Sequence, residues 1–276
     1  MKFRRSERLI DMTSYLLGHP RELISLSFFA DRYGAAKSSI SEDLAIIKET
    51  LEQQGIGTLK TIPGAAGGVK FFVKVSEEEA REYVGELCRL MENPERLLPG
   101  GYLYISDILG CPSLMNKAGR LFASYFAETD IDVVMTIATK GITLGYAVAA
   151  QLNVPVVIVR NDSRVTEGST VSINYVSGST KKIQTMLLSR RSLKEGSKVL
   201  IVDDFMRAGG TVNGMISLLE EFNCELAGIA VLVEAEQIVE RLVDDYLSVV
   251  KLSDVDLKNQ KITVREGNYF QKAYAQ

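Results

Sequence analysis

The sequence of 276 residues has no tryptophan, one histidine, three cysteines and six prolines. Cys88, Cys111 and Cys224 are widely separated and have neither disulfide nor metal-ligand spacing, which favours a reducing cytoplasm. His19 precedes Pro20 in a predicted turn, so we expect neither a metal site nor histidine-based catalysis. No apolar run approaches the ~20 residues of a membrane span, and the charged N-terminus lacks the apolar region of a signal peptide. We therefore expect a cytoplasmic protein without a membrane partner.

Charge is unevenly distributed along a chain whose net charge is −3. Residues 1–75 contain 11 Lys and Arg against 8 Asp and Glu, a net +3, whereas the rest contains 21 against 27, a net −6. A basic segment attached to an acidic one is typical of a nucleic-acid-binding module fused to a second domain. The length allows two domains with substantial cores. We place them at residues 1–74 and 75–276.

Helical patterns occupy most of the first 55 residues. Apolar residues recur at helical spacing over residues 4–17, and a short second helix is expected to end at Gly34. A third helix is expected to begin near Ser38, where Ser39 and Glu42 have capping-box spacing. Its predicted core-facing residues are Ile40, Leu44, Ile47 and Leu51.

Two strand-like stretches follow at residues 58–62 and 69–75, joined by the glycine-rich residues 63–68. Helices followed by such a hairpin resemble a winged helix-turn-helix, whose third helix would enter the major groove of DNA. Small hydroxyls allow close approach and cations neutralise phosphates. The predicted DNA contacts are Lys37, Ser38, Ser39 and Ser41, with Arg4, Arg5, Arg8, Arg32, Lys60 and Lys70 as further phosphate contacts. The alternative is a protein-contact or dimerisation domain whose basic side chains are merely solvated.

The rest of the chain alternates strands and helices after an acidic helix at residues 76–91 and a linker expected between residues 73 and 96. This alternation predicts a parallel sheet covered by helices. Strands are expected at residues 133–137, 154–159, 199–202, 228–233 and 249–252, and helices at 113–128, 142–151, 212–222 and 237–246.

A pair of acids follows the apolar strand at residues 199–202. Asp203 and Asp204 are expected at the carboxyl edge of the sheet, where open α/β sheets bind their ligands. Gly209, Gly210 and Thr211 then open a helix whose N-terminal N–H groups favour a phosphate. Because adjacent carboxylates accept hydrogen bonds from vicinal hydroxyls, the pattern predicts a sugar-phosphate site. An ordinary strand-to-helix turn with two solvated acids is the alternative.

This segment resembles the 5-phosphoribosyl-1-pyrophosphate (PRPP) signature of the type I phosphoribosyltransferases. The resemblance implies that Asp203 and Asp204 bind the ribose hydroxyls. It also implies a 5-phosphate loop made of Arg207, Ala208, Gly209, Gly210 and Thr211. Phe205, Met206 and Tyr102 complete the predicted PRPP site; the rings of Phe205 and Tyr102 suit stacking on a base or simple packing.

A second loop, Ala138, Thr139, Lys140 and Gly141, follows the strand at residues 133–137. The same resemblance implies that this loop holds pyrophosphate, often through an unusual cis peptide bond; a common turn with a solvated lysine is the alternative. The polar residues 160–190 correspond to a flexible hairpin that closes over the reaction centre in the transferases. A solvated hairpin without ligand contact is the alternative there.

Within the transferases, residues 98–276 are most similar to the xanthine/purine group. The segments that carry this similarity are Pro99-Gly100-Gly101-Tyr102 and residues 202–205. With the segments 37–44, 166–171 and 207–210, the whole chain resembles the phosphoribosyltransferase-type purine operon repressor family of Gram-positive bacteria. The fold class expected is therefore α/β: a type I phosphoribosyltransferase-like parallel sheet domain preceded by an α+β winged helix-turn-helix domain.

The family resemblance implies a homodimer that binds double-stranded DNA upstream of purine biosynthesis genes and senses PRPP. In that family PRPP lowers DNA affinity, although some relatives activate transcription. The resemblance implies no required cofactor. Whether Mg²⁺ accompanies PRPP is left open, and other diphosphate nucleotides could compete with PRPP.

Two differences from the active phosphoribosyltransferases predict loss of catalysis. Arg207 replaces an acid found in several transferases, and an arginine stays protonated and cannot act as a base. Residues 106–110 lack the asparagine–glutamine pair of the xanthine enzymes. The alternative is an active purine or xanthine phosphoribosyltransferase with an appended nucleic-acid-binding domain.

Overall fold

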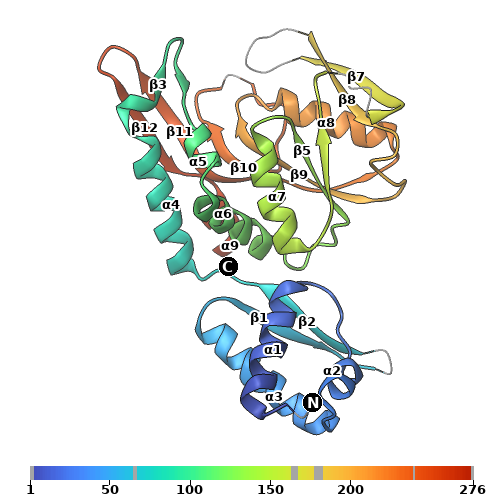
Figure 1. Cartoon of the computed structure of the whole chain (residues 1–276). Helices are drawn as coiled ribbons and strands as arrows, with labels where there is room; N and C mark the ends of the chain where they lie inside the picture. The colour runs from blue at the N-terminus through green and yellow to red at the C-terminus, as the bar shows by residue number, and fades with distance from the viewer. Residues whose placement is uncertain (1–2, 65–66, 163–166, 177–182, 239, 275–276) are drawn as a thin grey trace.

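The computed structural model describes residues 3–64, 67–162, 167–176, 183–238 and 240–274. A small N-terminal unit is followed by a larger α/β unit, and Figure 1 shows the two joined by a short connection next to α4. Among the described residues, no helix is both long and apolar enough to cross a membrane.

The N-terminal unit consists of helices packed against a β-hairpin. Its elements are α1 (Arg5–Gly18), α2 (Leu26–Tyr33), α3 (Lys37–Gln53), β1 (Gly57–Ile62) and β2 (Gly68–Val73). The four apolar residues predicted to face the core from α3 are all buried. The predicted capping box is wrong: Ala36 is the N-cap, so Ser39 lies inside the first turn and cannot cap the helix.

A buried carboxylate joins α1 to α3. Asp43 is completely buried, and its two oxygens accept hydrogen bonds from Arg5 Nε at 3.0 Å and Arg8 Nε at 2.5 Å. A buried charge is tolerated only when it is paired and hydrogen-bonded. These two arginines therefore stabilise the packing of the first helix on the third.

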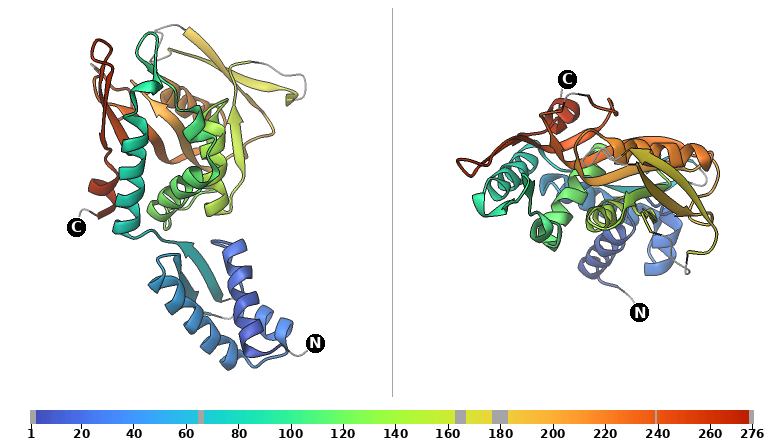
Figure 2. Two further views of the ribbon diagram at one scale, coloured as in Figure 1. Left: turned by 60° about the vertical axis from the view of Figure 1, so that its left-hand side comes forward. Right: turned by 90° about the horizontal axis from the view of Figure 1, so that it is seen from above.

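The acidic helix predicted at residues 76–91 is confirmed, inside the stretch expected to contain the linker. Most of residues 73–96 form α4 (Glu77–Met91) and the 3₁₀ turn η1 (Pro94–Arg96), and only residues 74–76 separate β2 from α4. Ser76 Oγ caps α4 by accepting a hydrogen bond from the N–H of Glu79 at 3.1 Å. Figure 2 shows α4 running along the edge of the larger unit, where it contacts β11 and β12.

The larger unit is built on a six-stranded sheet of order β12-β11-β10-β9-β5-β6 among the described residues. Its strands are β5 (Val133–Ile137), β6 (Val156–Val159), β9 (Lys198–Met206), β10 (Glu225–Ala235), β11 (Leu247–Asp256) and β12 (Lys261–Glu266). All pairings are parallel except that of β12 with β11. The predicted parallel sheet is thus confirmed, with one antiparallel edge strand that the sequence did not predict.

Helices cover both faces of this sheet. On one face α6 (Pro112–Tyr125) and α7 (Gly141–Leu152) pack against residues such as Val134 and Leu200. On the other, α8 (Gly210–Glu221) and the hairpin β7 (Thr170–Val176) and β8 (Ile183–Ser189) pack against residues such as Met135 and Ile201. Neighbouring strand residues point to opposite faces, so both faces are apolar, as in buried parallel sheets.

Shorter elements complete the larger unit. They are β3 (Leu97–Leu98), β4 (Tyr102–Leu103), α5 (Ser106–Leu109) and α9 (Tyr269–Tyr274). The helix predicted at residues 237–246 is wrong, because the described residues of that segment form irregular structure. Its hydrogen bonds run instead to β10 and to the loop after β9.

Three basic side chains connect the two units. Arg120 of α6 donates to the carbonyls of Gly55 at 3.1 Å and Lys74 at 3.3 Å, on either side of the hairpin β1–β2. Arg21 donates to the carbonyl of Thr129 at 2.7 Å. Lys60 forms an ion pair with Glu128. The N-terminal unit is therefore held against the larger one by direct contacts.

We predict that Asp43→Asn destabilises the N-terminal unit by about 3 kcal/mol, because it leaves the mostly buried Arg8 without its charge partner. Hydrogen-exchange mass spectrometry on the full chain should show peptides from α1 and α3 exchanging about a hundredfold faster. Lys48→Gln, which breaks an exposed pair with Glu52 on α3, is the control and should change exchange little. Equal protection in both variants would contradict the role of Asp43.

Candidate functional site

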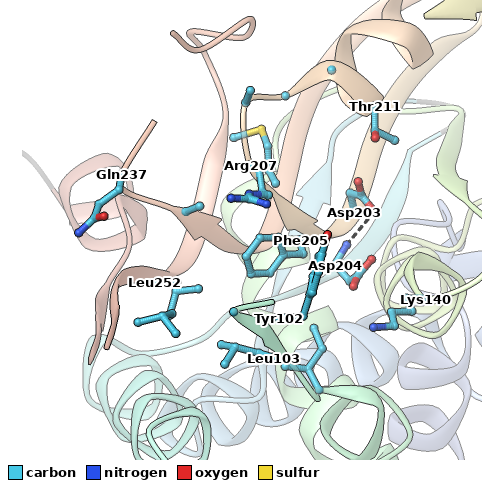
Figure 3. Close-up of a pocket in the computed structure, with 18 of the residues that line it drawn as sticks. Tyr102, Leu103, Lys140, Asp203, Asp204, Phe205, Arg207, Thr211, Gln237 and Leu252 are labelled. Carbon is cyan, nitrogen blue, oxygen red and sulfur yellow. Dashed lines mark hydrogen bonds between the residues drawn. The ribbon is translucent and has the colours of Figure 1, made fainter. Parts of the chain in front are cut away.

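A cavity of about 490 Å³ opens beside the carboxyl ends of β5 and β9. From β5 the chain passes outward to β6 and then returns to β9 on the other side of β5, which makes this a topological switch point. The cavity is lined by Gly100, Gly101, Tyr102, Leu103, Ile105, Lys140, residues 203–212, Ala235, Gln237 and residues 252–255. Figure 3 shows the acid pair and Lys140 at one end, Gln237 and Leu252 at the other, and Phe205 and Tyr102 between them.

The predicted acid pair lies inside β9, which continues to Met206, and not beyond its end as expected. Asp203 is 3% exposed and Asp204 8% exposed. Asp203 Oδ1 accepts a hydrogen bond from the N–H of Asp204 at 2.9 Å. Burial and the neighbouring Asp204 raise the pKa of Asp203. Burial also raises the pKa of Asp204, and Lys140 opposes that shift.

The predicted phosphate loop follows directly, between the end of β9 and the start of α8. Gly209 is the N-cap of α8 with φ +85°, a backbone conformation that favours glycine. The loop therefore presents the N-terminus of a twelve-residue helix to the cavity. Arg207 is exposed at the cavity and forms no ion pair among the described residues.

The second predicted loop joins β5 to α7. The peptide bond between Ala138 and Thr139 is cis, as the resemblance implied. Lys140 lines the cavity, whereas Ala138, Thr139 and Gly141 are not among its lining residues. Gly141 nevertheless approaches the acid pair, since a Cβ there would lie 2.3 Å from Thr136 Oγ1 and 3.3 Å from Asp203 Oδ1. Only glycine fits between these two atoms.

Tyr102 reaches the cavity from the small hairpin β3–β4. Arg96 anchors this hairpin, donating to the carbonyls of Leu90 and Tyr104 and forming a bidentate pair with Asp107 at 2.6 and 2.8 Å. Hydrogen bonds from Arg96 lower the pKa of Asp107. Tyr102 remains 53% exposed, so a large part of its ring is available to a ligand.

The sequence reasoning missed the opposite wall. Ala235, Gln237 and residues 252–255 come from the ends of β10 and β11 and the segment between them. A signal was present: both strands were predicted, and parallel strands bring their carboxyl ends to one edge of the sheet. The side chains after each predicted strand were therefore candidates.

The hairpin predicted for residues 160–190 is present as β7–β8, although residues 163–166 and 177–182 lie outside the described residues. Tyr175 and Met186 pack against Gly214 of α8. Burial raises the pKa of Tyr175, and side-chain hydrogen bonding with Thr211 opposes that shift. The hairpin thus contacts the last residue of the phosphate loop.

The residues predicted to contact DNA fall into two groups. Lys37, Ser38 and Ser41 are exposed in the first turns of α3, and Ser39 is half-buried beside them. Arg4 is also exposed, at the N-cap of α1. These five side chains lie on two helix starts of the N-terminal unit.

Most of the other predicted contacts have charged partners within the chain. Arg5 and Arg8 pair with the buried Asp43, and Arg32 pairs with Asp11 at 2.8 Å. Lys60 and Lys70 face each other across the hairpin β1–β2. Both line a groove of about 730 Å³ whose other residues include Glu128 and Asp130 of the larger unit. These two lysines therefore lie at the junction between the units.

The family described as "Bacterial purine repressor, N-terminal" matches residues 4–73, and the phosphoribosyl transferase domain family matches residues 105–270. The fold and the site thus define a phosphoribosyltransferase-type α/β domain behind a purine-repressor N-terminal domain, which confirms the predicted fold class. The purine biosynthesis transcriptional repressor PurR of Bacillus subtilis (strain 168) is 65% identical over 269 residues, covering 98% of this chain and 94% of the relative. The chain belongs to the bacterial purine repressor family.

Two further similarities support this assignment. The purine biosynthesis transcriptional activator PurR of Lactococcus lactis subsp. lactis (strain IL1403) is 49% identical over 267 residues, 97% of this chain and 98% of the relative. An adenine phosphoribosyltransferase structure from Rhodothermus marinus DSM 4252 superposes with a TM-score of 0.54 and 25% identity, covering 62% of this chain and 99% of that one. Family relatives thus bear both repressor and activator names.

We predict that Asp203→Asn raises the unfolding temperature at pH 7.5 by more than about 2 °C, the shift that 1 kcal/mol produces in a domain of this size. An acid whose pKa is raised by folding binds more protons in the folded state. Its burial therefore destabilises the fold increasingly as pH rises from the unfolded pKa to the raised one. The gain should shrink as pH falls toward the unfolded pKa, because below that value the carboxyl is protonated in both states.

Calorimetric melting curves between pH 5 and pH 8 measure this gain. Asp254→Asn, at the exposed rim of the same cavity, is the matched control and should not change the unfolding temperature. A lower unfolding temperature for Asp203→Asn at pH 7.5 would show that its carboxylate stabilises the fold.

Proposed function

We propose that this protein is a DNA-binding transcriptional regulator, most simply a repressor, of purine biosynthesis genes that senses PRPP. The observation that carries the proposal is the convergence of a buried acid pair and two loops on one cavity, within a chain of the purine repressor family. The N-terminal unit would bind double-stranded DNA upstream of purine genes. The larger unit would bind the effector.

PRPP fits the cavity in three parts. Its ribose hydroxyls would donate to Asp203 and Asp204, which accept few hydrogen bonds from the described protein. Its 5-phosphate would bind the N–H groups of residues 207–211 at the start of α8, and its pyrophosphate would bind the 138–141 loop with Lys140. Because both acids are buried, the hydrogen bonds that a ligand makes with them would be stronger than hydrogen bonds at the surface.

Mg²⁺ would reach this site on the ligand. Among the described residues, no group of three His, Cys, Asp or Glu side chains has the arrangement of a metal site. Pyrophosphate oxygens are themselves preferred Mg²⁺ ligands. Other diphosphate nucleotides would compete for the same loops.

The site lacks a base for phosphoribosyl transfer at the position of Arg207, because a guanidinium stays protonated. We therefore propose a catalytically inactive phosphoribosyltransferase homologue. The competing function, an active purine or xanthine phosphoribosyltransferase, predicts sustained nucleotide formation from PRPP and a purine base.

The DNA-binding surface would be the start of α3, where Lys37, Ser38, Ser39 and Ser41 cluster, together with Arg4. We propose a cytoplasmic homodimer as the binding unit, since a two-fold protein matches two half-sites one or more helical turns apart. Analytical ultracentrifugation with and without duplex DNA tests the dimer.

We predict that PRPP with Mg²⁺ weakens binding of a purine-promoter duplex, and that the double variant Asp203→Asn/Asp204→Asn binds DNA normally but no longer responds. In the double variant each asparagine keeps one acceptor oxygen, but its NH2 group cannot accept from a ribose hydroxyl and the negative charge is lost, while the distant α3 surface stays intact. Fluorescence anisotropy titrations measure both properties, with Glu221→Gln, an exposed acid at the C-terminal end of α8 that does not line the cavity, as the control.

Two results would contradict this proposal. A double variant that responds to PRPP like the parent would place the effector elsewhere. Steady formation of a nucleotide from PRPP and adenine, guanine, hypoxanthine or xanthine would favour the enzyme instead.

We predict that Lys37→Gln weakens binding to specific and non-specific duplexes alike and lowers the slope of log affinity against log salt by about 1, because one phosphate contact is lost. Lys48→Gln changes the same charge farther along α3 and should leave the slope unchanged. Anisotropy titrations between 50 and 200 mM salt measure the slopes. An unchanged slope in Lys37→Gln would remove the start of α3 from the interface.

A further inference from the structure

The segment between β10 and β11 is held in an irregular conformation by contacts at both of its ends. Arg241 Nη2 donates to the carbonyl of Ala235 at 2.6 Å, and Arg241 Nη1 lies 3.3 Å from Glu234 Oε2. The Arg241 guanidinium also lies 5.2 Å from the ring centre of Tyr246. One side chain in the middle of the segment therefore contacts the residues that flank it.

Glu234 is the centre of this network and is only 3% exposed. The Tyr246 hydroxyl donates to Glu234 Oε2 at 2.6 Å, and the Ser248 hydroxyl donates to Glu234 Oε1 at 2.7 Å. Asn268 fixes Ser248 in turn: its side-chain oxygen accepts from the N–H of Ser248 at 2.8 Å. Arg241 thus rests on a carboxylate that the sheet itself holds in place.

The residues after Arg241 contact the back of the phosphate loop. The N–H of Leu242 donates to the carbonyl of Ala208 at 2.8 Å. Because a trans peptide is planar, fixing the carbonyl of Ala208 toward Leu242 turns the N–H of Gly209 the opposite way. Val243 is buried against Gly209, where an added Cβ would come within 3.1 Å of its Cγ2. The segment therefore fixes both the orientation and the position of the loop.

We propose that Arg241 is a positioning residue for the phosphate loop, acting through Leu242 and Val243, and that it sets the affinity of that loop for a phosphate monoester. The proposal rests on the proposed function, since it concerns the 5-phosphate part of the same site. Arg241 itself does not line the cavity. The N–H groups of a loop bind an anion well only when they are oriented before the anion arrives.

Because the site has two loops, a specific effect on the phosphate loop can be distinguished from general destabilisation of the protein. Ribose 5-phosphate should need the acid pair and the 207–211 loop, whereas inorganic pyrophosphate should need the 138–141 loop. Arg241 contacts the first loop through its neighbours and has no described hydrogen bond to the second. A positioning role therefore predicts that only one of the two probes is affected.

The test is isothermal titration calorimetry of the full chain with ribose 5-phosphate and, separately, with pyrophosphate and Mg²⁺. Arg241→Met should weaken ribose 5-phosphate about tenfold and leave pyrophosphate unchanged. Arg241→Lys keeps the charge but not the planar guanidinium, so its affinity for ribose 5-phosphate should lie between those of the unaltered protein and Arg241→Met. Arg191→Met, an exposed arginine of the same unit, is the matched control and should bind both probes normally.

Val243→Ala provides a second variant that keeps Arg241 but removes the Cγ atoms that pack against Gly209 and the surrounding core. It should weaken binding of ribose 5-phosphate by a smaller factor. Unchanged ribose 5-phosphate binding in Arg241→Met, or equal weakening of both probes, would overturn the positioning role. If the unaltered protein binds PRPP but the variants behave as the control does, only this inference fails. If the unaltered protein binds none of the three ligands, the proposed effector site fails with it.

Discussion

The burial of two adjacent carboxylates in the middle of a sheet is the constraint on which the rest of the site depends. Asp203 and Asp204 occupy positions where the preceding four residues of β9 are wholly apolar and buried. Burial raises the pKa values of both acids, and the neighbouring Asp204 raises that of Asp203 further, so the charged pair destabilises the fold. Apolar residues of similar size would give a more stable sheet. Such an arrangement is consistent with a ligand that donates hydrogen bonds to both acids, which is what vicinal hydroxyls do.

Everything else at the site surrounds this pair from separate parts of the chain. The neighbouring strand β5 leads into the loop of Lys140, whose positive charge opposes the rise that burial causes in the pKa of Asp204. That loop can approach because Gly141 has no Cβ to meet Thr136. The hairpin carrying Tyr102 is fixed by Arg96, and the phosphate loop is contacted from behind by Leu242. Four segments far apart in the sequence therefore converge at one sheet edge, each held by a different local interaction.

The sequence predicted the parts of this arrangement whose signals are local. The strand, the acid pair and the glycine turn at residues 199–211 are contiguous, and the apolar stripe of α3 repeats at helical spacing; all of these were found. What failed depended on distant partners. Residues 237–246 have a helical pattern, but the hydrogen bonds of Arg241 to Ala235 and of Leu242 to Ala208 favour an irregular path. Nothing near Arg5 and Arg8 in the sequence indicates their pairing with the buried Asp43 either, and their role as phosphate contacts stays a prediction.

An effector in the larger unit affects DNA binding only if it binds two arrangements of the molecule with different affinity. A long, flexible tether would leave the N-terminal unit indifferent to the state of the cavity. Here the tether is three residues long, and buried apolar side chains of both units belong to one continuous cluster. Arg120, which holds the hairpin β1–β2, lies on α6, and α6 packs on α7, the helix that begins at the Lys140 loop. A change at that loop therefore has a packed route of two helices to the DNA-binding unit, and the Lys60–Glu128 pair lies across the same junction.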